Sequence, residues 1–161
     1  MDKQNAEYQV TVLTSDDQAG IEFCVSYLTK AWKQTREESL ARITECVRRD
    51  EGNLCIVCKS GTQPIGMVLF RKGTGLKLPH PIYYWIQGLY VADEFRNSPA
   101  VLKIFLLLRK TLKAEGVKEI HLGVDPHVPK LKTSYLAMGF KELGVKSSAI
   151  GHVYDILQMK L

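Results

Sequence analysis

The segment from residue 82 to residue 124 constrains the fold of this chain more than any other. Its apolar pattern predicts a strand over 82–91, a long helix that ends at Gly116 and a second strand over 119–124. Two strands of one sheet that are joined through a helix run parallel, and the connection between them is right-handed. The chain is therefore expected to be an α/β protein with a mixed sheet.

The start of this helix carries its own signal. Ser98 is a good N-cap, and Pro99 fits the first helical position. A strand that ends against a helix N-terminus presents unpaired backbone N–H groups with a partial positive charge, and such a place suits a phosphate. From these residues alone, simple capping by Arg96 and Ser98 is an equal alternative. The abundant apolar residues, Leu102 and Leu106 among them, predict a helix that is buried on more than one face.

Further elements follow from periodicity and turn residues. Strands are expected at 8–13, 54–59 and 65–71, a short helix over 129–138, and a final hairpin of 140–143 with 153–161. Two helices should follow the first strand, each opened by a capping box, at Ser15 and at Thr35. The predicted architecture is a central, mostly antiparallel sheet of six to seven strands with one parallel βαβ crossover, flanked by about four helices.

Composition favours a single domain spanning residues 1–161, because 45% hydrophobic and 24% charged residues are typical of a globular chain of this length. The net charge of +5 favours anionic ligands, which include coenzyme A, nucleic acid and acidic surfaces. The basic residues are scattered, so nucleic acid is disfavoured as a substrate but stays open. No apolar run approaches a membrane span, and the N-terminus resembles no targeting signal, so we expect a cytoplasmic protein without a membrane partner.

The four cysteines are expected to form neither a disulfide nor a metal site, and Cys24 and Cys46 are expected to be reduced, buried thiols. Cys55 and Cys58 lie in a predicted strand, where positions three apart face opposite sides, and no second Cys-x-x-Cys completes a zinc site. Cys24 and Cys46 share helical stripes with apolar neighbours. No metal is therefore expected.

One order of motifs resembles a known family. Leu89-x-Val91, Arg96, a helix with Leu102 and Leu106, and then the segment 135–140 (Tyr-Leu-Ala-Met-Gly-Phe) resemble the GNAT superfamily of acyl-coenzyme A-dependent N-acetyltransferases. The resemblance implies the GNAT fold and transfer of acetyl from acetyl-CoA to a primary amine, by direct attack in a ternary complex. The acceptor would be a small molecule or a protein or peptide amine, and a homodimer stays open.

The resemblance also implies site residues. Tyr135 would protonate the leaving thiolate, and one backbone N–H at the end of the 82–91 strand would stabilise the oxyanion. The cofactor would be held by the main chain of Leu89, Tyr90 and Val91 and by the pyrophosphate loop of Arg96, Asn97, Ser98, Ala100 and Val101. Where the family has two loop glycines, however, this chain has Pro99 and Val101. These substitutions motivate an alternative, a catalytically degenerate binding or regulatory protein with weak or no use of acetyl-CoA.

The general base is not evident from the sequence. No Asp or Glu occurs between Glu51 and Asp93, and Gln87 stands where relatives often carry a carboxylate. An amide cannot act as a base near neutral pH, so His80, His121 or a tyrosine-lined water chain are the open alternatives. Aromatic residues would line a substrate cleft or the core: Trp32, Tyr83, Tyr84 and Trp85.

Overall fold

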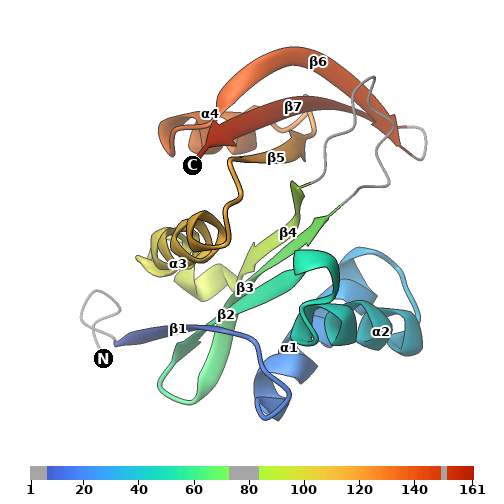
Figure 1. The fold of residues 1–161 in the computed structure, drawn as a ribbon, viewed down its shortest axis with the longest axis vertical. Helices are drawn as coiled ribbons and strands as arrows, with labels where there is room; N and C mark the ends of the chain where they lie inside the picture. The colour runs from blue at the N-terminus through green and yellow to red at the C-terminus, as the bar shows by residue number, and fades with distance from the viewer. Residues whose placement is uncertain (1–6, 73–83, 150–151) are drawn as a thin grey trace.

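The computed structural model describes residues 7–72, 84–149 and 152–161 (Figure 1). Its elements follow in chain order: β1 (Tyr8–Val12), α1 (Gln18–Ala31), α2 (Arg36–Val47), η1 (Asp50–Gly52), β2 (Leu54–Ser60), β3 (Gln63–Lys72), β4 (Tyr84–Val91), η2 (Asp93–Phe95), α3 (Ala100–Ala114), β5 (Glu119–Val124), α4 (Pro129–Ala137), β6 (Lys141–Ala149) and β7 (His152–Lys160). The order of helices and strands is the one that the sequence predicts.

The strands form one seven-stranded sheet in the order β1-β2-β3-β4-β5-β7-β6. All neighbours are antiparallel except β4 and β5, which are joined through α3 and run parallel. The predicted mixed α/β architecture with a single parallel crossover is thus confirmed. Because β4 is the middle strand, both of its edges would be paired in an ordinary sheet.

The sheet is covered on both faces in its first half. Helices α1 and α2 lie on one face of β2–β4, and α3 lies on the other (Figure 1). Strand β2 shows the consequence, because all residues from Leu54 to Cys58 are buried. Cys55 and Val57 pack in the cluster under α1 and α2, whereas Leu54, Ile56 and Cys58 pack in the larger cluster under α3. A continuous apolar run is what a strand buried on both faces requires.

Helix α3 is buried on one face only, so the expectation of wider burial was wrong. Ile104, Leu108 and Leu112 are fully buried at successive turns, whereas Leu102 and Leu106 are 58% and 56% exposed. The sheet covers only one side of the helix, and the outward leucines have no second layer to pack against. The helix also begins one residue later than predicted, with Pro99 in the N-cap place.

The two predicted capping boxes have different outcomes. At α2 the box is confirmed, since Thr35 Oγ1 accepts from the Glu38 amide and the Glu38 carboxylate accepts from the Thr35 amide. At α1 the N-cap is Asp17 and not Ser15, because the Asp17 carboxylate accepts from the Gly20 amide at 3.0 Å. The helix therefore begins two residues later than predicted, because the Asp17 carboxylate is a better cap than the Ser15 hydroxyl. The Asp17 carboxylate also pairs with Lys59 at 2.6 Å.

Other boundaries shift modestly. Strand β4 is described from Tyr84, and the preceding residues 73–83 lie outside the described part of the chain, as does the candidate base His80. The final hairpin is longer than predicted, because β6 extends to Ala149 and has nine residues, whereas β7 has the predicted length. Within the described residues, no helix has both the length and the apolar character that a membrane crossing requires.

Candidate functional site

Strand β4 leaves its parallel neighbour almost immediately. Among the described residues, its only pairing with β5 is between Trp85 and His121. Beyond that point β5 continues in register with β7 as far as Val124, while β4 continues with β3 alone. Trp85 and Ile86 are buried, but residues 87–90 are only half-buried although they lie in the middle of the sheet. One edge of the central strand is therefore open toward β5.

A β-bulge accompanies this divergence. Leu69 pairs with Gly88 and the next residue, Phe70, pairs with Ile86, so Gln87 is an extra residue in β4. A bulge bends its strand and increases the local twist. The Gln87 Oε1 atom is buried and has no hydrogen-bond partner among the described residues. This carbonyl oxygen is an acceptor placed at the point where the open edge begins.

The turn after β4 has only some of the free backbone amides that an anion-binding loop needs. The Arg96 guanidinium pairs with Asp93 at 2.6 Å, and both side chains are exposed. The Ser98 amide donates to the Phe95 carbonyl at 3.0 Å, and the Ala100 amide donates to Ser98 Oγ at 3.3 Å. The Ser98 hydroxyl thus accepts from the first helical amide, but the prediction that Ser98 is the N-cap was wrong, because Pro99 holds that place. Two of the four amides expected to hold a phosphate already have partners within the loop.

Tyr135 lies on α4 against aromatic neighbours. Its ring centroid is 5.6 Å from that of Phe140 and 6.4 Å from that of Phe105. Burial, together with a smaller contribution from the nearby Tyr27 hydroxyl, raises the pKa of the Tyr135 hydroxyl to about 12. Tyr27 comes from α1 and stacks on Tyr90 of β4, so the fold brings two tyrosines from distant segments close enough to interact. Tyr135 therefore stays protonated throughout the physiological pH range.

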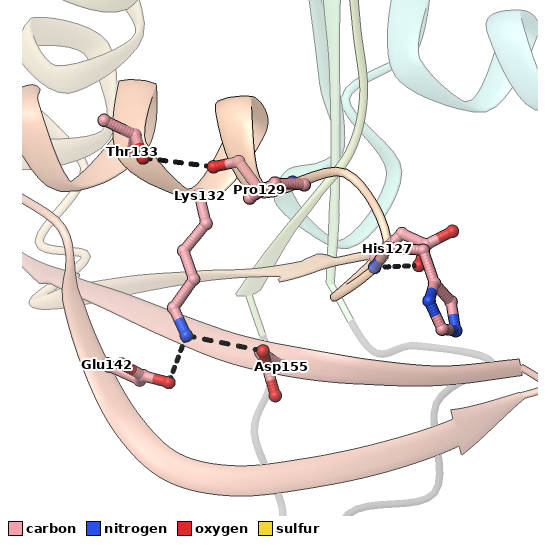
Figure 2. A network of polar contacts seen from close by, with 7 residues as sticks. His127, Pro129, Lys132, Thr133, Glu142 and Asp155 are labelled. Atoms are coloured by element: carbon pink, nitrogen blue, oxygen red, sulfur yellow. Dashed lines mark hydrogen bonds and ion pairs between the residues drawn. The ribbon is translucent and has the colours of Figure 1, made fainter.

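A charge network fixes α4 on the final hairpin. Figure 2 shows Lys132, one turn before Tyr135, with its ammonium between Glu142 of β6 and Asp155 of β7. The Lys132 Nζ atom lies 3.4 Å from Asp155 Oδ2 and hydrogen-bonds to Glu142. The hydrogen bond to Glu142 also raises the pKa of Lys132 above its ordinary value. Helix α4 is thus tied to both strands of the hairpin.

His121 has a structural place at the one pairing point of β4 and β5. It is 5% exposed, its ring lies 5.6 Å from the Trp85 ring, and its Nε2 atom lies 3.1 Å from Gln158 Nε2. Because the Gln158 amide nitrogen can only donate, His121 Nε2 accepts and the ring is neutral. Burial lowers the pKa of His121, against the opposing effect of Glu119. A ring engaged in this way is a poor candidate for the general base.

The buried His121 should make folding sensitive to mild acid. The unfolded chain binds the proton more readily than the native protein, because the native pKa lies below the ordinary value near 6.5. The stability is therefore complete above about pH 6.5 and falls as the pH decreases below it. In urea unfolding at pH 7 and pH 5, His121→Gln should lose less stability on acidification than the wild type. His127→Gln is the matched control, because His127 is exposed, and it should behave as wild type. An equal loss in all three proteins would contradict this account.

The aromatic candidates separate into core and site. Tyr84 stacks on Phe70, with centroids 6.0 Å apart, and Trp85 is 2% exposed, so both belong to the core. Trp32 is half-buried and lies beside Gly88 of β4, and Tyr83 lies outside the described residues. Sequence reasoning missed Tyr27, which meets the site from α1. The available signal was Gly88 itself, since a glycine inside a strand often marks a close approach of another group.

The described residues offer no metal centre. Across residues 7–72, 84–149 and 152–161, no three His, Cys, Asp or Glu side chains come together in a way that could hold a metal ion. All four cysteines are free and buried, and burial was predicted for Cys24 and Cys46. Burial raises the pKa of Cys46 to about 12 and that of Cys58 to about 11, so these thiols stay protonated at neutral pH.

The comparisons with known proteins agree with this geometry. Residues 20–140 match the family model described as "Acetyltransferase (GNAT) family". The fold is similar to a ribosomal-protein-alanine N-acetyltransferase from Brucella melitensis (TM-score 0.74, 15% identity, 95% of this chain and 99% of that chain). It is also similar to an N-acetyltransferase from Staphylococcus aureus Mu50 (0.72, 14%, 96% and 99%) and to the PaiA N-acetyltransferase from Thermoplasma acidophilum in complex with coenzyme A (0.65, 18%, 96% and 99%). A search of curated protein sequences finds no match.

The matched region contains the open edge of β4, the loop before α3 and Tyr135, and it spans most of the chain. At 14–18% identity the solved structures establish the fold alone. The family model matches far more than half of the sequence. The chain therefore belongs to the GNAT family of acetyltransferases.

Proposed function

We propose that this protein transfers an acetyl group from acetyl-CoA to a primary amine by direct attack in a ternary complex. The observation that supports this most is the open edge of β4. After the Trp85–His121 pair, the central strand has an unpaired edge and half-buried residues. Unpaired backbone N–H and C=O groups in a protein interior need partners. An extended ligand that contains amides can supply them as an added strand would.

The residues present fit acetyl-CoA, which supplies an acetyl group activated as a thioester. The main chain of Leu89, Tyr90 and Val91 would pair with the pantetheine arm. Arg96 and the amides of Asn97 and Val101 would hold the pyrophosphate at the start of α3. The amides of Ser98 and Ala100 would join them by exchanging their present partners, the Phe95 carbonyl and Ser98 Oγ, for phosphate oxygens.

Tyr135 acts in this proposal as a hydrogen-bond donor to the leaving sulfur. With a pKa of about 12, complete transfer of its proton to an alkyl thiolate near 8.5 would be uphill by about 3.5 units, or roughly 5 kcal/mol. Stabilisation of the thiolate by a hydrogen bond has no such cost. As the N–C bond forms and the C–S bond breaks, the amine nitrogen loses one proton to water, and the released thiolate takes one proton from water. A backbone N–H of β4 stabilises the charge on the carbonyl oxygen.

The amine must arrive deprotonated or lose its proton to water. Neither Gln87 nor the engaged His121 can accept that proton readily. Gln87 Oε1 can accept a hydrogen bond from the amine and orient it. The rate should therefore follow the fraction of free amine in solution.

Thermal unfolding with acetyl-CoA tests the proposal. At about 100 times Kd the ligand should add ~2.7 kcal/mol of stability, and the melting temperature should rise by roughly 5 to 10 °C. Coenzyme A should act similarly, whereas ATP at equal concentration controls for any polyanion. Formation of free thiol with a panel of primary amines then tests transfer. The absence of a shift at millimolar acetyl-CoA would contradict the proposal.

A degenerate binding or regulatory protein is the second candidate, and the pyrophosphate loop favours it. Pro99 has no N–H, and the Ser98 and Ala100 amides already donate within the loop. Such a protein would bind acetyl-CoA weakly or not at all. It would release no free thiol from acetyl-CoA in the presence of any amine, and this result separates it from an enzyme.

The missing donor at Pro99 can be restored. Pro99→Ala returns one N–H to the start of α3, and a hydrogen bond to a charged group contributes roughly 1.5 kcal/mol or more. We expect the Kd for acetyl-CoA, from calorimetry or thermal titration, to fall about tenfold. Pro99→Gly returns the same N–H with greater backbone freedom. A gain in acetyl-CoA affinity in Pro99→Gly alone would therefore indicate that close approach of the backbone to the phosphate matters, and not the restored N–H donor. No gain in either variant would show that the proline does not limit binding.

A further inference from the structure

Gly88 is a glycine that the fold itself does not require. It lies in β4 opposite Leu69, and its φ angle is outside the left-handed region. An added Cβ would meet Tyr27 Cε1 at 3.7 Å, Trp32 Cζ2 at 3.8 Å and Leu69 Cβ at 3.9 Å, all of which are ordinary contacts. Glycine inside a strand is less stable than alanine because it loses more backbone entropy on folding. Neither the backbone nor the packing explains this residue.

Gly66 in the neighbouring strand β3 shows what a structural glycine looks like. A Cβ there would lie 3.1 Å from Val91 Cγ2, 3.2 Å from Ile104 Cδ1 and 3.2 Å from the Tyr90 carbonyl oxygen. The carbonyl belongs to the paired backbone of β4 and cannot move aside. Gly66 thus allows α3 to pack closely on the sheet. No comparable contact restricts Gly88.

Aromatic side chains surround Gly88 on the face of α1. The Tyr27 ring stacks on Tyr90 with centroids 4.5 Å apart and an interplanar angle of 17°, and Phe23 adds a ring 5.9 Å from Tyr90. We call Tyr27, Trp32, Gly88 and Tyr90 the aromatic platform. All four residues are half-buried, so their apolar surface is only partly covered. The platform lies on the open part of β4, and Tyr27 is close enough to Tyr135 to affect its ionisation.

We infer that Gly88 leaves room for the acceptor, and that this acceptor is a primary amine that carries a flat aromatic group, which packs on the β4 backbone beside Tyr27 and Trp32. This inference rests on the proposed function, since it names the substrate class of the same site. A Cβ would hold a ring away from the peptide plane of β4, whereas Gly88 leaves its half-buried backbone without a side chain beside Tyr27 and Trp32. Aromatic rings pair favourably in offset or edge-to-face geometry beyond the area they bury. An aliphatic amine gains much less from such a surface.

A binding experiment tests the inference without relying on catalysis. Trp32 is half-buried and Trp85 is buried, so an aromatic ligand on the platform should change the fluorescence of Trp32. The protein is titrated with 2-phenylethylamine and with n-propylamine, both with and without saturating coenzyme A. We expect a saturable change with 2-phenylethylamine that Trp32→Phe abolishes, and an affinity for n-propylamine that is at least tenfold weaker.

Gly88→Ala is the decisive variant. It should weaken 2-phenylethylamine binding at least tenfold and n-propylamine binding less than twofold. Its melting temperature should equal or exceed that of the wild type, because alanine restricts the unfolded chain and makes only ordinary contacts. Gly66→Ala is the contrasting variant, and it should lower the melting temperature because the Tyr90 carbonyl cannot yield.

Three results would overturn the inference. The first is unchanged 2-phenylethylamine binding in a folded Gly88→Ala protein. The second is equal binding of the two amines by the wild type. The third is a loss of coenzyme A affinity in Gly88→Ala with amine binding intact, which would assign the glycine to the pantetheine arm. Failure of the proposed function would give a different result, because the wild type would then show no thermal shift with acetyl-CoA. The amine titrations without coenzyme A do not depend on that shift, so the two failures can be told apart.

Discussion

Tyr135→Phe is expected to lower kcat for acetyl transfer by about 100-fold while the Kd for acetyl-CoA stays within twofold. Removal of one donor that stabilises developing charge commonly costs a factor of this size. The phenyl ring keeps the contacts with Phe105 and Phe140, so the fold should not change. Thiol release at saturating amine gives kcat, and thermal titration gives Kd.

The pH profile separates this role from a purely structural one. Because the pKa of Tyr135 is about 12, its hydroxyl stays protonated, and kcat/KM should rise with the free amine without falling between pH 8 and pH 10. Tyr84→Phe is the matched control, since the Tyr84 ring stacks on Phe70 in the core, and it should change kcat less than twofold. An unchanged kcat in Tyr135→Phe, or a loss confined to KM, would contradict the assignment.

Phe70→Ala is expected to destabilise the protein by about 3 to 5 kcal/mol, the usual cost of emptying a fully buried aromatic site. Phe70 is 0% exposed, it stacks on Tyr84, and it pairs with Ile86 next to the Gln87 bulge. Urea unfolding measures the loss directly. The melting temperature should fall by roughly 10 °C for a chain of this size.

Phe70→Leu is the control for this variant. Leucine keeps most of the apolar contact, so the loss should be much smaller than that of alanine and the acetyl-CoA shift should persist. A loss below about 1 kcal/mol for Phe70→Ala would show that the β3–β4 ladder relaxes into the space. The bulge would then not depend on this ring.

Much of the architecture was predictable because it depends on neighbouring residues. The crossover from β4 through α3 to β5 follows from one apolar strand, one uninterrupted helix and a second strand. The strand predicted over 54–59 has its two cysteines on opposite faces, as expected, because Cys55 and Cys58 pack in different clusters. Hydrophobic periodicity records such local choices directly.

The candidate site was predictable only in part. The segment from Leu89 to Val101 and Tyr135 were singled out through short motifs, and their roles remain predictions. The loop's internal hydrogen bonds were not foreseen, because the partner of an amide such as that of Ala100 depends on the turn geometry. The outward leucines of α3 were misjudged for a related reason, since burial depends on how many layers surround a helix.

The sequence by itself determined the order of the elements, the opposite facing of Cys55 and Cys58 in β2, and the family resemblance. Only the tertiary structure decided that β4 leaves β5 after one pair, that Gln87 is extruded at a bulge, and that Tyr27 comes near Tyr135. The physical reason is the range of the interactions involved. Helix and strand formation depends on residues a few positions apart, whereas an unpaired strand edge and a pair of distant tyrosines exist only once the whole sheet has formed.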